Sequence, residues 1–286
     1  MDKVIGLGKL GCTIAEELTA YPEYRIYKID ADIEERGSFA LGVSQDMEAY
    51  EKNFDPTAAE IYLRSIKPGD KILLIVSGGD PISGCVLKLL ECVKDADINV
   101  LYIAPDREMI SGVQKRDDKI AFNVLQEYAR SGVFKSLILV RKPIVEKLMG
   151  DVSIQQYEKS ISYFISYTIA MINYFEHTDP IVANTLTPVD WCRIGTYGIS
   201  SLDEENQDAN LLFPLEAISD IHFFYGVPSQ DLDNDPTLMK KIKEHVKSFK
   251  NGSISTSFSV YSTSFDNLMV LCSATSAKIQ SLDQAE

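Results

Sequence analysis

The chain has 286 residues, of which 45% are hydrophobic, and its 28 basic and 42 acidic residues give a formal charge of −14. This composition supports a full hydrophobic core and argues against a surface for nucleic acid or anionic membranes, because phosphate groups require positive patches. Five cysteines without C-x-x-C spacing favour a reducing compartment. The chain enters a strand soon after Met1, and no apolar run reaches the roughly 20 residues of a membrane span. We therefore expect a cytoplasmic protein without membrane insertion.

The first half of the sequence alternates short apolar runs with amphipathic segments, which is typical of a parallel sheet with helices on both faces. A polar stretch, 33–56, is too long for a simple connector and is expected to form a functional loop with some helix. The predicted strands are 4–6, 24–29, 71–76, 99–104 and 136–140, and the predicted helices are 12–20, 57–65, 83–93 and 117–130.

The middle of the chain is predicted to be helical. Residues 153–176 repeat apolar side chains on one side at helical spacing, which indicates a buried helix. Asp179 and Pro180 end it. A second helix is expected to begin at Thr187, because threonine is a good N-cap and Pro188 suits the first helical position.

The last third is predicted to form a smaller α+β unit, because one amphipathic helix there lies among apolar strands. Its elements are strand 218–227, helix 236–249 and strands 253–262 and 267–274. The predicted fold class is therefore α/β. The predicted parts are a nucleotide-binding domain (1–186), a central helix with its connector (187–210) and a C-terminal α+β domain (211–286).

Two glycine-rich turns, 6–11 and 77–84, each follow a predicted strand and precede a helix. Ligands of open α/β sheets bind at such strand ends, so the two turns are placed to hold one nucleotide from both sides. The alternative to a nucleotide site is that the glycines serve only to permit close packing of the turns.

One reading of the first turn is a dinucleotide site. Gly6, Gly8 and Gly11 form the G-x-G-x-x-G pattern, and Asp30 ends the next strand, where it would bind ribose hydroxyls. This pattern makes an NAD-dependent oxidoreductase one hypothesis. None of the three histidines forms an evident acid–base pair for hydride transfer; they are His177, His222 and His245.

The order of all the elements resembles the tubulin and FtsZ family from about Val4 to about Ala274. Turn 6–11 with Cys12 looks like the family's first nucleotide loop. Segment 78–84, which reads GGDPISG, lies where the family signature GGGTGTG falls.

Three further segments carry the same resemblance. Segment 29–32 looks like the asparagine–threonine–aspartate loop, with Asp30 in place of the asparagine. Segment 187–194 matches the start of the central helix, and 218–274 matches the smaller second domain. A generic dehydrogenase is not expected to carry this order of elements.

The resemblance implies GTP as ligand, with Mg²⁺ as a candidate companion ion and no protein metal site. It also implies head-to-tail self-association, in which Asp190 is the one candidate acid that acts on a neighbour's nucleotide. Around the nucleotide it places Gly6, Gly8, Gly11, Cys12, Gly78, Gly79, Ser83 and Gly84 at the phosphates, Asp30 and Asp32 by the ribose or the γ-phosphate loop, and Arg116 at the γ-phosphate end.

The second turn departs from the family pattern. Pro81 removes one backbone N–H, and Asp80 introduces a carboxylate. A carboxylate about 5 Å from a phosphate charge costs on the order of 3 kcal/mol at an effective dielectric constant near 20. A bridging cation, or a carboxylate turned outward, would remove this cost.

The catalytic and base-reading positions depart as well. Of the family's N-x-D-x-x-D acids, at least one is missing, and loss of such a group commonly costs about 10²–10⁴ in rate. Ile161 and Ser162 occupy the place where an acid would read guanine.

The sequence therefore predicts a divergent cytoskeletal-type protein that self-associates head to tail, binds GTP weakly and hydrolyses it slowly or not at all. A compact relative of the type that phages or plasmids carry fits best. Two alternatives stay open. One is a pseudo-GTPase that serves as a structural or regulatory protein partner, and the other is the NAD-dependent oxidoreductase.

Overall fold

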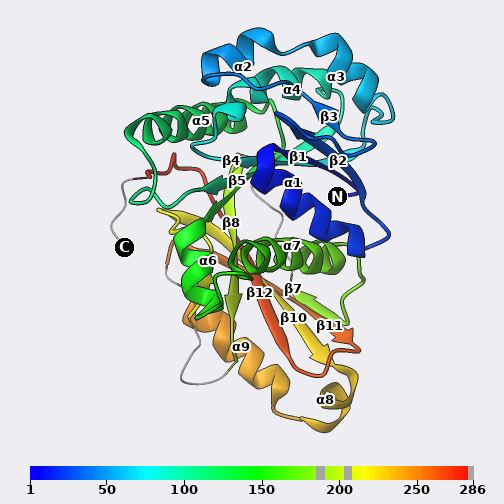
Figure 1. Ribbon diagram of the computed structural model, residues 1–286. Coiled ribbons are helices and arrows are strands. Elements are labelled where there is room, and N and C mark those ends of the chain that lie inside the picture. The colour runs from blue at the N-terminus through cyan, green and yellow to red at the C-terminus, as the bar shows by residue number, and fades with distance from the viewer. Residues whose placement is uncertain (185–190, 203–207, 251, 283–286) are drawn as a thin grey trace. The chain divides into compact units, whose positions relative to one another are not determined.

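The computed structural model describes residues 1–184, 191–202, 208–250 and 252–282 (Figure 1). The chain divides into two compact units, Met1–Tyr167 and Thr168–Gln280. The boundaries inferred from the sequence, after 186 and after 210, stay predictions.

The first unit is built on a parallel sheet in the order β3-β2-β1-β4-β5-β6. Its central strands are rich in apolar residues, and Ile72 to Val76 of β4 are buried, as expected when helices cover both faces. The α/β expectation is confirmed. The strands are β1 (Lys3–Leu7), β2 (Arg25–Asp30), β3 (Phe39–Ala40), β4 (Lys71–Ser77), β5 (Asp97–Ala104) and β6 (Ser136–Arg141).

Side-chain caps mark where three of the helices of this unit begin. Asp46 and Asp55 accept backbone N–H bonds at two helix starts, and Ser111 forms a capping box with Gln114. The predicted polar loop 33–56 contains one short strand and one of these helices. The helices are α1 (Gly8–Glu17), η1 (Leu18–Ala20), α2 (Met47–Asn53), α3 (Pro56–Leu63), η2 (Pro81–Cys85), α4 (Val86–Cys92), α5 (Gly112–Ser131), α6 (Lys142–Met149) and α7 (Tyr157–Glu176), the last of which ends in the second unit.

The second unit contains a mixed sheet in the order β8-β12-β10-β11-β7, with β9 paired to β8. Strands β10 and β11 are parallel, and the other pairs are antiparallel. Helix α9 packs Leu238, Ile242 and Val246 onto Phe223 and its neighbours, so spacing of four residues builds this core. The elements are β7 (Val182–Asn184), β8 (Ile194–Ser200), β9 (Asn210–Leu211), β10 (Ile218–Pro228), α8 (Ser229–Asn234), α9 (Leu238–Ser248), β11 (Ser255–Thr263) and β12 (Met269–Ser276).

The helix expected from Thr187 onward is only partly testable, because 185–190 lie outside the described residues. Beyond them, 191–193 are not helical, which contradicts the last part of the expected helix start 187–194. Ile194–Ser200 form strand β8, which pairs antiparallel with β12. The sequence of β8, IGTYGIS, is rich in β-branched and glycine residues and poor in helix formers. In the described part of the chain, no helix combines the length and the apolar character that crossing a membrane requires.

Candidate functional site

The two glycine turns lie at the carboxyl ends of β1 and β4, two neighbouring strands in the middle of the first sheet. Strands β1 and β4 are parallel neighbours, and Leu7 at the end of one pairs with Val76 near the end of the other. Both turns therefore emerge side by side at the carboxyl ends of these strands, as the sequence predicts.

In the first turn, two glycines serve close packing of α1 against the sheet. A methyl group on Gly6 would collide with the carbonyl of Gly11, and one on Gly11 would lie 2.9 Å from the carbonyl oxygen of Ile75. Gly8 differs, because its φ of +74° lies in the region that favours glycine.

The space next to Gly8 is filled by the second turn. A methyl group on Gly8 would lie 2.9 Å from Asp80 Oδ2 and 2.9 Å from Ile82 Cγ2. Side chains of the protein itself thus occupy the place where close approach of a phosphate would be expected.

Asp80 also uses the hydrogen-bond donors of its own turn. Its Oδ1 accepts a bond of 3.1 Å from the Ile82 N–H and so caps η2. Its carbonyl oxygen accepts bonds from the Ser83 N–H (3.0 Å) and the Ser83 hydroxyl (2.7 Å). Donors that a phosphate loop would offer to a ligand are therefore engaged within the protein.

The glycines of the second turn are packed against protein as well. A methyl group on Gly78 would collide with the side chains of Asp118 and Tyr102, and one on Gly84 would collide with the backbone of Met47. Gly79, with φ of +72°, faces the carbonyl of Gln114. Glycine is therefore required at Gly78 and Gly84 for packing of the second turn against the rest of the protein.

The carboxylates near the two turns disfavour binding of an anion there. Burial, and then the nearby charge of Asp30, raise the pKa of Asp80 above its usual range. Asp30 itself accepts a 2.8 Å bond from the Ala31 N–H. Within the described residues, no group of three or more His, Cys, Asp or Glu side chains is arranged to hold a metal ion.

Cys12 is a packing residue in this geometry. Its Sγ lies 3.3 Å from the Gly6 carbonyl oxygen and 3.5 Å from that of Ile29. Burial raises the pKa of the Cys12 thiol to about 12, so the group stays protonated at neutral pH.

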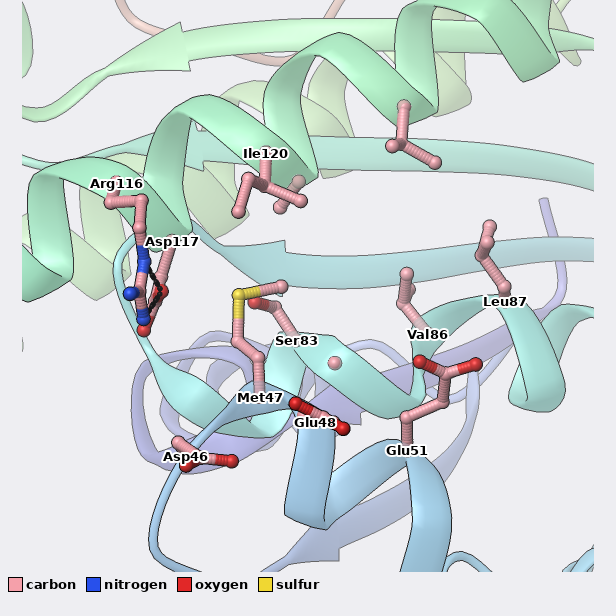
Figure 2. Close-up of a pocket in the computed structure, with 13 residues that line it drawn as sticks. Asp46, Met47, Glu48, Glu51, Ser83, Val86, Leu87, Arg116, Asp117 and Ile120 are labelled. Carbon is pink, nitrogen blue, oxygen red and sulfur yellow. Dashed lines mark hydrogen bonds and ion pairs between the residues drawn. The ribbon is translucent and has the colours of Figure 1, made fainter.

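The remaining predicted ligands are dispersed. Asp32 is exposed, and Arg116 lies on α5, where its Nε and one terminal nitrogen donate to Asp117 Oδ1. Arg116, Ser83 and Gly84 line a separate cavity of about 550 Å³ between α2, α4 and α5 (Figure 2). Asp190 lies outside the described residues. The roles of all these residues toward a nucleotide stay predictions.

The position that the resemblance assigns to base recognition is buried. Ile161 is fully buried in α7, and the buried Ser162 hydroxyl has no hydrogen-bond partner among the described residues. Neither side chain is placed to read a base edge.

Sequence reasoning missed a buried polar network behind the second turn. The Tyr102 hydroxyl donates to Asp118 Oδ1 over 2.7 Å, and Arg107 donates to Asp118 Oδ2 over 2.8 Å. Asp118 is fully buried, so both partners are needed to hold its charge. The available signal was an acid on the inward face of a helix, four residues before the buried Phe122.

Compared by sequence, the chain matches no protein-family model and no curated protein. Compared by structure, it is similar to an empty FtsZ dimer from M. jannaschii, with a TM-score of 0.71, 13% identity and coverage of 96% of this chain and 88% of the other.

Two other solved structures are similar over nearly the whole chain. A GTPγS-form protofilament of Bacillus thuringiensis serovar israelensis TubZ gives a TM-score of 0.68 at 14% identity and covers 96% of this chain and 87% of its own. The GDP-bound CetZ1 monomer of Haloferax volcanii gives 0.69 at 14%, with 97% and 94% covered. The chain therefore has the tubulin/FtsZ-type fold, as its order of elements predicts.

Proposed function

We propose that this chain is a tubulin/FtsZ-like protein that associates head to tail with copies of itself and binds GTP only weakly. The fold supports the first half of the proposal, because similar structures include an FtsZ dimer and a TubZ protofilament. One observation supports the second half: Asp80 lies against Gly8, where a phosphate would otherwise be expected.

The weak affinity follows from geometry and charge together. To reach the backbone at Gly8, a phosphate must displace Asp80 and free the Ile82 N–H from its carboxylate. If Asp80 stays charged nearby, repulsion adds about 3 kcal/mol at 5 Å, which is more than a hundredfold in affinity. Mg²⁺ between phosphate and carboxylates is the candidate ion that would reduce this repulsion.

Hydrolysis is proposed to be slow. Asp190 is the one candidate acid for positioning water on a neighbour's nucleotide. The buried, apolar Ile161 side chain offers no hydrogen-bonding group for guanine. A chain of this type would assemble without the rapid nucleotide cycle that two acids support.

A nucleotide-free structural protein of the same fold is the second candidate. It is favoured because the glycines of both turns pack against atoms of the protein itself. The dinucleotide hypothesis has a weaker basis. The strand order of the first sheet is also that of dinucleotide-binding folds, but the Asp30 carboxylate already accepts the Ala31 N–H and lies close enough to Asp80 to raise its pKa.

Pelleting and light scattering of the purified chain, with GTP, with GDP and without nucleotide, test the proposal. We expect sedimentable polymer that depends only slightly on the nucleotide, and phosphate release far below one turnover per second. A chain that stays monomeric up to high concentration would contradict the assembly part. Rapid phosphate release that Asp190→Ala abolishes would contradict the part on hydrolysis, and a preference for NAD over GTP would favour the oxidoreductase.

A further inference from the structure

The cavity between α2, α4 and α5 lies behind the second turn, whose Ser83 and Gly84 form part of its wall. It holds about 550 Å³, within the range of protein ligand sites. Its walls are apolar, and its rim and one wall carry carboxylates. The lining includes Met47, Val86, Leu87, Ile120, Ala121 and Val124, together with Asp46, Glu48, Glu51 and Asp117.

One helix continues the apolar surface past the cavity. On α5, Val113, Ile120, Val124 and Tyr128 share one face with Asp117, because they recur at intervals of three, four or seven residues. Three of them are well exposed, with 56%, 47% and 36% of the surface of Val113, Ile120 and Tyr128 open to solvent. The face extends over about 22 Å at 1.5 Å per residue, which is longer than a small molecule and suits a helix.

The negative charge of this surface favours a positively charged partner. Glu48 and Glu51 rise from α2 on one side, opposite Ile120 and the Arg116–Asp117 pair on α5 (Figure 2). Four carboxylates and one guanidinium line the cavity, and Lys88 beside it donates to the Glu51 carbonyl over 2.6 Å. The surface therefore carries a clear excess of negative charge.

Asp117, which lines the cavity, is incompletely hydrogen-bonded within the described residues. Its side chain is 1% exposed, its Oδ1 is bound by Arg116, and its Oδ2 has no hydrogen-bond partner among the described residues. A buried carboxylate oxygen without a donor is costly, so a cationic donor from a partner would be stabilising there.

From these observations we infer that the groove of α2, α4 and α5 docks a basic amphipathic helix of a partner protein. Apolar side chains of the partner pack on Ile120 and Val124, and a lysine or arginine enters toward Asp117 between Glu48 and Glu51. This inference does not rest on the nucleotide proposal, because neither Gly8 nor Asp80 lines the groove, although Ser83 and Gly84 of the second turn form part of its wall.

The test uses a labelled synthetic peptide of about 16 residues, with leucines on one helical face and lysines on the other, and measures fluorescence anisotropy with the full chain. Micromolar binding is expected, weakening as salt rises. Ile120→Ser should weaken it roughly tenfold or more, and Glu51→Gln or Asp117→Asn several-fold. Ile61→Ser is the matched control, because Ile61 is exposed on α3 and does not line the groove, and it should change nothing.

Three results would overturn the inference. A scrambled peptide of the same composition binding equally well would show only attraction to an acidic protein. Ile61→Ser weakening binding as much as Ile120→Ser would place the site elsewhere. In sedimentation without peptide, self-association that Ile120→Ser abolishes would mean that the groove holds a second copy of this chain. Unchanged circular dichroism of each variant keeps these results separate from unfolding.

Discussion

Replacing Asp80 by asparagine is the sharpest perturbation of the two turns. Asparagine keeps the size of the side chain and the oxygen that accepts the Ile82 N–H, and it removes the charge. A phosphate reaching the backbone at Gly8 lies about 5 Å from the carboxylate, where the repulsion is about 3 kcal/mol at an effective dielectric constant of 20. Asp80→Asn should therefore tighten GTP binding by up to about a hundredfold.

Equilibrium dialysis with labelled GTP and with pyrophosphate measures this change. Glu60→Gln is the matched control, because it removes the same charge from the exposed face of α3 and should leave both affinities unchanged. The double variant Asp80→Gly with Pro81→Thr should tighten binding further, since it also restores an N–H donor. If neither variant binds nucleotide better than the parent chain, the second turn does not meet phosphate and the reasoning fails.

The same substitution has a second readout in stability. The pKa of Asp80 is raised in the folded chain, so its contribution to stability is present below the ordinary carboxyl pKa and is lost as pH rises through the folded pKa. Asp80→Asn should therefore raise the free energy of unfolding at pH 7 and leave it nearly unchanged near pH 3. An equal effect at both pH values would show that Asp80 is not destabilised by its surroundings.

Three further predictions concern the packing around the candidate site and the core of the second unit. Gly78→Ala drives a methyl group into the Asp118 side chain and should cost roughly 3 kcal/mol in urea unfolding, whereas Gly112→Ala, which has open space, should be nearly neutral. Burial lowers the pKa of His222 to about 4, so its contribution to the free energy of unfolding is fully present above pH 6.5 and falls by about 3 kcal/mol as pH drops from 6.5 to 4. His222→Gln should reduce this loss, measured as the difference in the free energy of unfolding between pH 7.5 and pH 4.5. Iodoacetamide at pH 8 should modify Cys12 far more slowly in the folded than in the unfolded chain, by mass spectrometry of its peptide, and equal rates would contradict the thiol pKa of about 12.

Much of the fold could be predicted from the sequence, because its central strands and long helices carry strong patterns. The buried run 72–76 and the repeat along 157–176 depend only on spacing. Strands β7 and β9, of three and two residues, could not be predicted because pairing partners far along the chain define them. Strand β8 was not predicted, because its sequence lacks an alternating pattern and its partner β12 lies far along the chain.

The residues of the candidate site could be predicted from the sequence, but the direction in which the Asp80 side chain points could not. The sequence shows that Asp80 and Pro81 depart from a phosphate loop, but both an inward and an outward carboxylate were compatible with it. The choice depends on η2, which holds the Asp80 side chain on the Ile82 N–H and so turns it toward Gly8. The network of Tyr102, Asp118 and Arg107 joins three segments that no local pattern connects.

The affinity of the unaltered chain for GTP at pH 7.5 with Mg²⁺, measured by equilibrium dialysis, tests the central claim most directly. We expect a dissociation constant no tighter than about 0.1 mM, because a repulsion of about 3 kcal/mol from Asp80 would weaken an affinity of about 1 µM roughly a hundredfold. Submicromolar binding by the unaltered chain would show that Asp80 moves aside at little cost, which would contradict the proposed weak binding of GTP.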